Sequence, residues 1–208
     1  MSEISALAVK ELRNISGAGM MDCKKALSEA SGNLDKAMDI LRKSGIAKAQ
    51  KKSGRSTKEG MIYSYIHPGS KLGVLVEVNC ETDFVANTDD FINLNKDLAM
   101  HIAASTPISI NREDISSDII EREKEIYADQ ASQSGKPDNI IDKMIEGRMN
   151  KFYQDNVLLE QAFVKDPDKN VQDIITDTIA KLGENIVVAR FVRFQLGEQL
   201  NHSSSSNN

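Results

Sequence analysis

The residues with the clearest chemical use lie at one junction, where an apolar strand passes into a polar turn. Leu75 to Val78 carries β-branched residues and predicts a strand, and Thr82 can cap the turn that follows. Phe84 falls in the short connection that leaves the strand, and such connections on a rigid scaffold often bind other molecules. Two interpretations are open from these residues alone. Phe84 is either an ordinary core residue behind a helix cap, or an aromatic contact for a partner.

Groups with the spacing of a catalytic or metal site are absent from the sequence. The histidines His67, His101 and His202 stand singly, and none lies at metal-ligand spacing from Cys23 or Cys80. The signatures of a serine hydrolase, a zinc protease and a dinucleotide-binding fold are missing as well. We therefore expect no catalytic residue, no cofactor and no metal ion, and an interaction protein in place of an enzyme.

The length and composition bound the class of protein. A chain of 208 residues with 40% apolar residues can form one medium domain and a small one. It contains no run of 18 apolar residues and no signal peptide, so we expect no membrane association, a mature chain that begins near Met1, and a cytoplasmic location. The two cysteines form no CxxC pair and are expected to be reduced thiols.

The charge is divided unevenly along the chain. The net charge is −5, yet the first 60 residues carry 12 Lys and Arg against 7 Asp and Glu. The remainder is strongly acidic, which argues against wide phosphate binding there. Basic charge concentrates in residues 46–60, which we interpret as a basic linker without direct nucleic-acid contact, because no aromatic side chain is interleaved to stack on bases. Its cations are Lys48, Lys51, Lys52, Arg55 and Lys58.

Three short helices separated by glycines are predicted in residues 1–45. Apolar residues recur at intervals of three and four, and the pattern is interrupted at Gly17 and Gly32 and ends at Gly45. A module of this size buries little surface by itself. Two interpretations follow: a separate partner-docking module, or a lid that packs on the rest of the chain.

An α+β core is predicted in residues 61–200. The apolar period changes to two after residue 60, which predicts a β-hairpin with a loop at 67–71. Helices predicted at 88–107 and 171–182, and a strand at 186–196, complete a small antiparallel sheet packed by helices.

A helical hairpin is predicted in residues 116–154 of this core. Its two helices are divided where Gly135 and Pro137 provide a helix stop and a helix start. Because Glu, Lys and Arg lie on the outer faces, we expect the hairpin to project from the body. Residues 201–208 are polar and are predicted to be a disordered tail.

The last predicted strand is apolar on both faces. If its alternation is unbroken, one face carries Val187 and Phe191. The opposite face then carries Val188, Val192 and Phe194. Three strands with one set of helices cannot cover two apolar faces, so we expect the second face to pack against another copy of the chain in a homodimer.

Two motifs resemble the signatures of the elongation factor Ts family. Ser16 to Leu27 reads SGAGMMDCKKAL and is similar to the N-terminal signature, although Ser16 stands where threonine is usual. Val78 to Ala86 reads VNCETDFVA and is similar to the core signature. The resemblance covers roughly residues 2–198 and is to short members of the family, which have a single core half.

The resemblance implies a guanine-nucleotide exchange factor. A member of this family is expected to bind elongation factor Tu in its GDP form and to speed GDP release, so that GTP can rebind during translation elongation. The resemblance also implies that the three-helix module has a ubiquitin-associated-like fold and docks on the GTPase through Arg13, Met20 and Met21. Short members are expected to dimerise, which gives a two-plus-two complex with the GTPase.

The same resemblance implies a second contact at the junction. Asp83 and Phe84 are expected to reach between two helices of the GTPase domain, with Phe84 in an apolar pocket and Thr82 and Val85 as neighbouring contacts. Two functions of other classes stay open from the residues alone. One is an RNA-binding adaptor that uses the basic N-terminal part, and the other is a recruitment adaptor whose module captures a ubiquitin-like protein.

Overall fold

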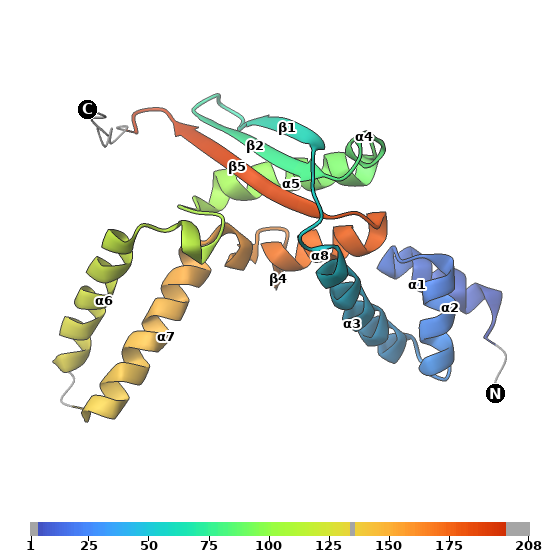
Figure 1. Cartoon of the computed structure of the whole chain (residues 1–208), viewed down its shortest axis with the longest axis horizontal. Coiled ribbons are helices and arrows are strands. Elements are labelled where there is room, and N and C mark those ends of the chain that lie inside the picture. Colours follow the sequence, from blue (N-terminus) through green and yellow to red (C-terminus); the bar gives the residue numbers. More distant parts are fainter. Residues whose placement is uncertain (1–3, 134–135, 199–208) are drawn as a thin grey trace.

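A three-stranded antiparallel sheet forms the centre of this computed structural model, which describes residues 4–133 and 136–198 (Figure 1). The strand order is β1-β2-β5. β1 and β2 form the hairpin that the alternating apolar residues predict, with its loop between Ile66 and Leu72. The three strands span Glu59–Ile66, Leu72–Cys80 and Ile186–Gln195.

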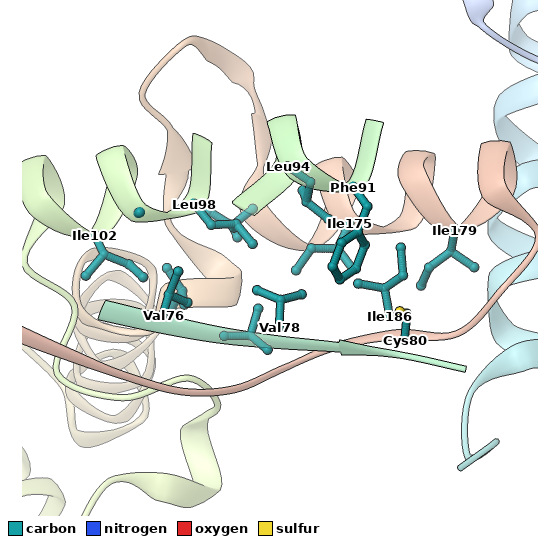
Figure 2. Close-up of a cluster of buried hydrophobic side chains, with 14 of the residues drawn as sticks. Val76, Val78, Cys80, Phe91, Leu94, Leu98, Ile102, Ile175, Ile179 and Ile186 are labelled. Carbon is teal, nitrogen blue, oxygen red and sulfur yellow. The ribbon is translucent and has the colours of Figure 1, made fainter. Parts of the chain in front are cut away.

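Two helices cover one face of the sheet. α5 (Asp89–Ser105) and α8 (Val171–Leu182) lie where the sequence predicts helices, and Thr88 caps α5 by accepting the N–H of Phe91 at 3.3 Å. Figure 2 shows apolar side chains of both helices pointing toward β2 and β5. Phe91 is fully buried, and burial of a side chain of that size contributes about 2–3 kcal/mol. This layer of helices on a sheet confirms the predicted α+β class.

The opposite face of the sheet carries no helix within the described residues (Figure 1). The strand pairing shifts after Glu77, which opposes Arg190, so that Val78 opposes Val188 and Ala189 forms a β-bulge. The predicted unbroken alternation is therefore wrong, because the extra residue moves Val188 to the buried, helix-covered face. We call the face without helices the open sheet face. Its exposed apolar residues are Ile62, Ile66, Leu75, Val192 and Phe194.

The three predicted N-terminal helices are present as α1 (Ala6–Ser16), α2 (Met20–Glu29) and α3 (Leu34–Lys52). Gly17 ends α1 in the left-handed conformation, with φ 67°, and its N–H donates to the carbonyl of Arg13 at 2.8 Å. The helices share a small apolar core of Val9, Leu12, Cys23, Ala26, Leu27, Ala30 and Ala37.

The third helix is longer than predicted. It continues through Gly45 to Lys52, so the expectations that it ends at Gly45 and that a linker begins at residue 46 are wrong. A Cβ on Gly45 would lie 3.3 Å from the Cβ of Ala180 in α8, so the missing side chain permits the two helices to approach closely. Ala49 is buried in the main core and ties the last turns of α3 to the body.

A helical hairpin of α6 (Ser117–Ser132) and α7 (Asp138–Asn156) projects from the body, as predicted (Figure 1). Its base is held by Arg112, whose guanidinium lies 4.3 Å from the centre of the Tyr153 ring. The same guanidinium donates to Glu160 at 2.6 Å. The hairpin therefore extends from a fixed base.

Short elements complete the described chain. The polar strand β4 was not predicted, because its sequence DPDKN lacks an apolar pattern. No helix in the described ranges is long and apolar enough to cross a membrane. The predicted tail at 201–208 lies outside the described residues. The short elements are α4 (Asp83–Ala86), the 3₁₀ helices Arg112–Asp114 and Leu158–Glu160, β3 (Ala162–Phe163) and β4 (Asp166–Asn170).

Candidate partner-binding site

Strand β2 passes into the short helix α4 through Glu81 and Thr82. Thr82 has an extended backbone with φ −132°, and its hydroxyl oxygen accepts the N–H of Val85 at 3.4 Å. This hydrogen bond confirms the predicted cap. Val85 and Ala86 are buried in the main core, so the turn is anchored from its inner side.

The outer side of this turn exposes an aromatic ring. Phe84 is 82% exposed, more than any other large apolar residue of the described chain, which excludes the interpretation of Phe84 as a core residue. Asp83 is exposed beside it, and the two residues are named the tip. Thr82 is half-buried, whereas Val85 is only 9% exposed, so its side chain packs inward and supports the tip. An aromatic held outward by a rigid turn is typical of a binding contact.

A carboxylate from the end of α8 holds the turn. The side chain of Glu184 accepts the N–H groups of Glu81 and Thr82 at 3.1 and 3.0 Å. It also accepts the Thr82 hydroxyl at 2.7 Å. In return, the Glu81 carboxylate accepts the N–H of Asn185 at 2.7 Å. These four hydrogen bonds are named the Glu81–Glu184 clasp.

Sequence reasoning missed Glu184, because 102 residues separate it from Thr82. Its one signal is its position directly after Gly183, which ends α8 in the left-handed conformation with φ 80°. That position marks a connection between elements, but it does not reveal which backbone groups the carboxylate binds.

The charges around the clasp have defined effects on the titrating groups. The pKa of Glu81 is lowered, because the N–H of Asn185 and the nearby Arg55 guanidinium stabilise its carboxylate. The pKa of the Cys80 thiol is raised to about 11, because the thiol is buried and lies close to the Glu184 carboxylate. Cys80 is therefore a neutral thiol at physiological pH, and it donates to the carbonyl of Thr82 at 3.1 Å.

The three residues that the sequence indicates as contacts of the N-terminal helices also lie at the surface. Arg13 is in the last turn of α1, and Met20 and Met21 begin α2, with Met21 74% exposed. Leu7 and Ile15 of α1 are exposed as well and were not predicted as contacts. In Figure 1 these helices and α4 lie at the end of the molecule away from the α6–α7 hairpin.

Three of the five basic side chains in the predicted linker contact acidic or carbonyl groups of the same chain. Lys48 pairs with Asp22 at 2.7 Å, and Lys52 donates to the carbonyl of Gly183. Arg55 lies 3.5 Å from the Glu81 carboxylate. The Lys48 contact joins α3 to α2, whereas the contacts of Lys52 and Arg55 connect the end of α3 and the segment after it to the end of α8 and to the clasp. In the same described part of the chain, no group of three or more His, Cys, Asp or Glu side chains is placed to hold a metal ion.

Known proteins resemble this chain in sequence along nearly its whole length. The model of the family described as Elongation factor TS matches residues 7–198. Elongation factor Ts of Thermoanaerobacter sp. (strain X514) is 58% identical over 202 residues, which cover 97% of this chain and 99% of the relative. Elongation factor Ts of Fervidobacterium nodosum is 60% identical over 196 residues, which cover 94% of this chain and all of the relative. The relative from Geobacter sulfurreducens is 57% identical over 202 residues, covering 97% of this chain and 94% of its own length.

The class that the family model and these relatives define is that of the translation elongation factors. Within that class, the chain belongs to the elongation factor Ts family. The relatives are matched along 94% or more of their own length, so the family assignment applies to the N-terminal helices and to the core alike.

Proposed function

We propose that the chain is a guanine-nucleotide exchange factor that binds elongation factor Tu in its GDP form and promotes GDP release, so that GTP can rebind. Membership of the elongation factor Ts family supports this function. The observation that carries it is Phe84, which is 82% exposed on a turn whose other side is buried. In this function the chain makes and breaks no covalent bond.

The tip acts as a wedge. A buried aromatic anchor supplies binding free energy, and a pocket that accepts Phe84 only in the nucleotide-free shape converts that energy into weaker GDP binding. The coupling is reciprocal: GDP weakens binding of the factor by the same ratio. Asp83 beside the ring adds a charge that favours one orientation of the tip in its pocket.

The first three helices form a second contact with the GTPase through Arg13, Met20 and Met21. This docking module is tied to the body, because Gly45 packs on Ala180 and Lys52 donates to the end of α8. A tethered second contact raises the effective concentration of the tip at its pocket. The module therefore contributes mainly to affinity, while the tip contributes to GDP release.

A homodimer forms through the open sheet face. Its exposed apolar residues need cover, and its central charges, Glu77 and Arg190, pair at 2.7 Å within one protomer. A symmetric dimer places the same patch against itself, which requires a patch without uncompensated charge. Asp83 and Phe84 are not among the residues of the open sheet face, so in this proposal each protomer binds one GTPase in a two-plus-two complex.

The alternative of an RNA-binding adaptor has less support. Three of the basic side chains on which it depends, Lys48, Lys52 and Arg55, are engaged within the chain. Phosphate binding would have to replace these contacts.

The test is the release of fluorescent GDP from elongation factor Tu with and without the chain. Acceleration by the wild type is expected, and Phe84→Ala is expected to lose about 30-fold of it, because an interface anchor contributes about 2 kcal/mol. Ile119→Ala serves as a matched control, since Ile119 is an exposed apolar residue on the distant helix α6. An unchanged release rate with the wild type would refute the exchange function, and an active Phe84→Ala would refute the wedge.

A further inference from the structure

Glu184 is fixed on both sides along the chain. Before it, the N–H of Gly183 donates to the carbonyl of Ile179 at 2.8 Å and ends α8. After it, β5 begins at Ile186, which pairs with Cys80 of β2. The carboxylate therefore extends from a rigid connection to the turn that carries the tip.

The hydrogen bond to Glu184 determines how the Thr82 hydroxyl is used. A hydroxyl has a single hydrogen, and that of Thr82 is donated to Glu184 at 2.7 Å. The oxygen is then available only as an acceptor, and it accepts the N–H of Val85 at 3.4 Å. Glu184 thus orients the cap that begins α4.

The short length of α4 makes this cap important. The helix spans only Asp83–Ala86, and a single turn is not stable without outside contacts. Val85 and Ala86 anchor its inner side, and the clasp fixes its start. Phe84 is the second residue of the helix, so its direction follows that of the start.

The reverse contacts reinforce the connection. The N–H of Asn185 donates to Glu81 at 2.7 Å, while the Asn185 side chain donates to the carbonyl of Arg55 at 3.0 Å. Asn185 is buried. The connection after α8 and the turn before α4 therefore move as one unit, and the segment after α3 is joined to them.

We propose that Glu184 is a positioning residue for nucleotide exchange: it fixes Thr82 and the start of α4, and so directs Phe84 toward the partner. This inference rests on the proposed exchange function. Glu184 acts through Thr82, so its effect on GDP release requires Phe84 to be present.

Two substitutions distinguish the hydrogen-bonding position of the Glu184 side chain from its negative charge. Glu184→Gln keeps an oxygen that can accept both backbone N–H groups, and its NH₂ can donate to the Thr82 oxygen. Glu184→Asp keeps the charge, but its side chain is shorter by one methylene. We expect it to be too short to accept hydrogen bonds from the two backbone N–H groups and from the Thr82 hydroxyl at once. A positioning role therefore predicts that the neutral variant works better than the charged one.

The first experiment compares GDP release at saturating concentrations of each variant. Glu184→Ala and Glu184→Asp are expected to be about tenfold slower than wild type, as for the loss of a charge-assisted hydrogen bond, and Glu184→Gln within about threefold of it. Glu160→Ala is the control, because it removes a carboxylate of similar burial that pairs with Arg112 far from the tip. Wild-type rates for Glu184→Ala, or an active Glu184→Asp beside an inactive Glu184→Gln, would overturn the proposal.

The second experiment combines Glu184→Ala with Phe84→Ala. If Glu184 acts by placing the ring, the double variant is no slower than Phe84→Ala alone. If the two losses multiply, Glu184 acts by another route and the proposal fails. General destabilisation by Glu184→Ala does not depend on the ring, so it would make the double variant slower than Phe84→Ala alone.

Hydrogen exchange of the backbone amides tests whether Glu184 holds the turn, independently of any measurement of GDP release. The N–H groups of Glu81 and Thr82 are expected to exchange at least tenfold faster in Glu184→Ala than in wild type. If the wild-type chain does not accelerate GDP release from elongation factor Tu, the proposed nucleotide-exchange function fails. Faster hydrogen exchange of these two amides in Glu184→Ala would still show that Glu184 holds the turn. Unchanged amide exchange would refute the positioning role.

Discussion

The tip and the open sheet face both leave apolar side chains in solvent, but they are built in opposite ways. The tip is one aromatic ring on a turn held by the clasp and by the buried Val85. The open sheet face spreads its apolar side chains over three paired strands. A small rigid projection can enter and leave a pocket, whereas a flat face needs a broad matching surface. From this difference in shape and support we propose a transient contact for the tip and a lasting interface for the open sheet face.

The largest expected effect is the difference in free energy of unfolding between alanine variants of two phenylalanines that lie close in the sequence. Phe91 is fully buried beneath the sheet, while Phe84 is 82% exposed. Phe91→Ala is expected to lower the free energy of unfolding by about 3–5 kcal/mol, and Phe84→Ala by less than about 0.5 kcal/mol. Chemical denaturation measures both. Equal losses would mean that Phe84 supports the fold, and the tip would not be a free contact.

A charge on the open sheet face is expected to break the proposed dimer. Leu75→Asp places a carboxylate in the apolar face of both protomers, so the dissociation constant of the dimer should rise about 100-fold. Leu75 is 44% exposed, and Ile119→Asp is the matched control at 42% exposure on α6. Sedimentation measures the mass, and GDP release per chain should persist in the monomer. A wild-type chain that is already monomeric would contradict the dimer.

The thiol beneath the tip is expected to be protected. With its pKa raised to about 11, Cys80 has far less thiolate at pH 8 than an ordinary cysteine, so its alkylation in the native chain should be at least about 100-fold slower than in the unfolded chain. Mass spectrometry of iodoacetamide-treated protein measures this rate. Glu184→Ala should raise it by loosening the turn, whereas Glu160→Ala should not. Rapid alkylation of native Cys80 would show that the base of the tip is open.

The smallest expected effect is on the pH dependence of stability. It involves His101, which lies outside both the tip and the open sheet face. The N–H of Val164 donates to Nδ1 of His101 at 3.3 Å, so Nε2 carries the hydrogen and donates to Gln161 at 2.9 Å. Burial lowers the pKa of His101, which keeps the ring neutral in the folded chain. The unfolded chain therefore binds the proton more readily, and the free energy of unfolding should fall as the pH drops below about 6.5.

His101→Gln should reduce this dependence of stability on pH, because it removes the buried ring whose pKa is lowered. Thermal unfolding between pH 5 and 8, in about half-unit steps, measures the slope. An identical slope in His101→Gln would contradict the buried neutral ring. Because His101 and Gln161 lie in the core, the tip should keep its activity over the range in which the fold persists.

Sequence patterns predicted the elements whose signals are local. The hairpin of β1 and β2, the helix α8 and the cap at Thr82 follow from alternation, helical spacing and a hydroxyl at the right place. The exposure of Phe84 could not be decided from its own neighbourhood, because a helical turn beside the core has both an inner and an outer side. The family signature indicated the outer one.

The remaining features depend on contacts between distant segments. The bulge at Ala189 is a property of pairing between two strands, and the extension of α3 past Gly45 depends on close packing against Ala180. Glu184 reaches a turn 102 residues away. Local sequence patterns contain no information on these distances. The support of the tip was therefore missed, although the sequence had indicated Asp83 and Phe84 as contacts.

The most direct test measures how tightly the chain binds elongation factor Tu with and without GDP. If the tip couples binding to GDP release, the wild-type chain binds the nucleotide-free form far more tightly than the GDP form, and the ratio equals the factor by which the chain weakens GDP binding. Phe84→Ala should shrink this ratio by about 30-fold, while the docking module still binds both forms. The same ratio for Phe84→Ala and wild type would show that Phe84 contributes only affinity, and would contradict its role as a wedge.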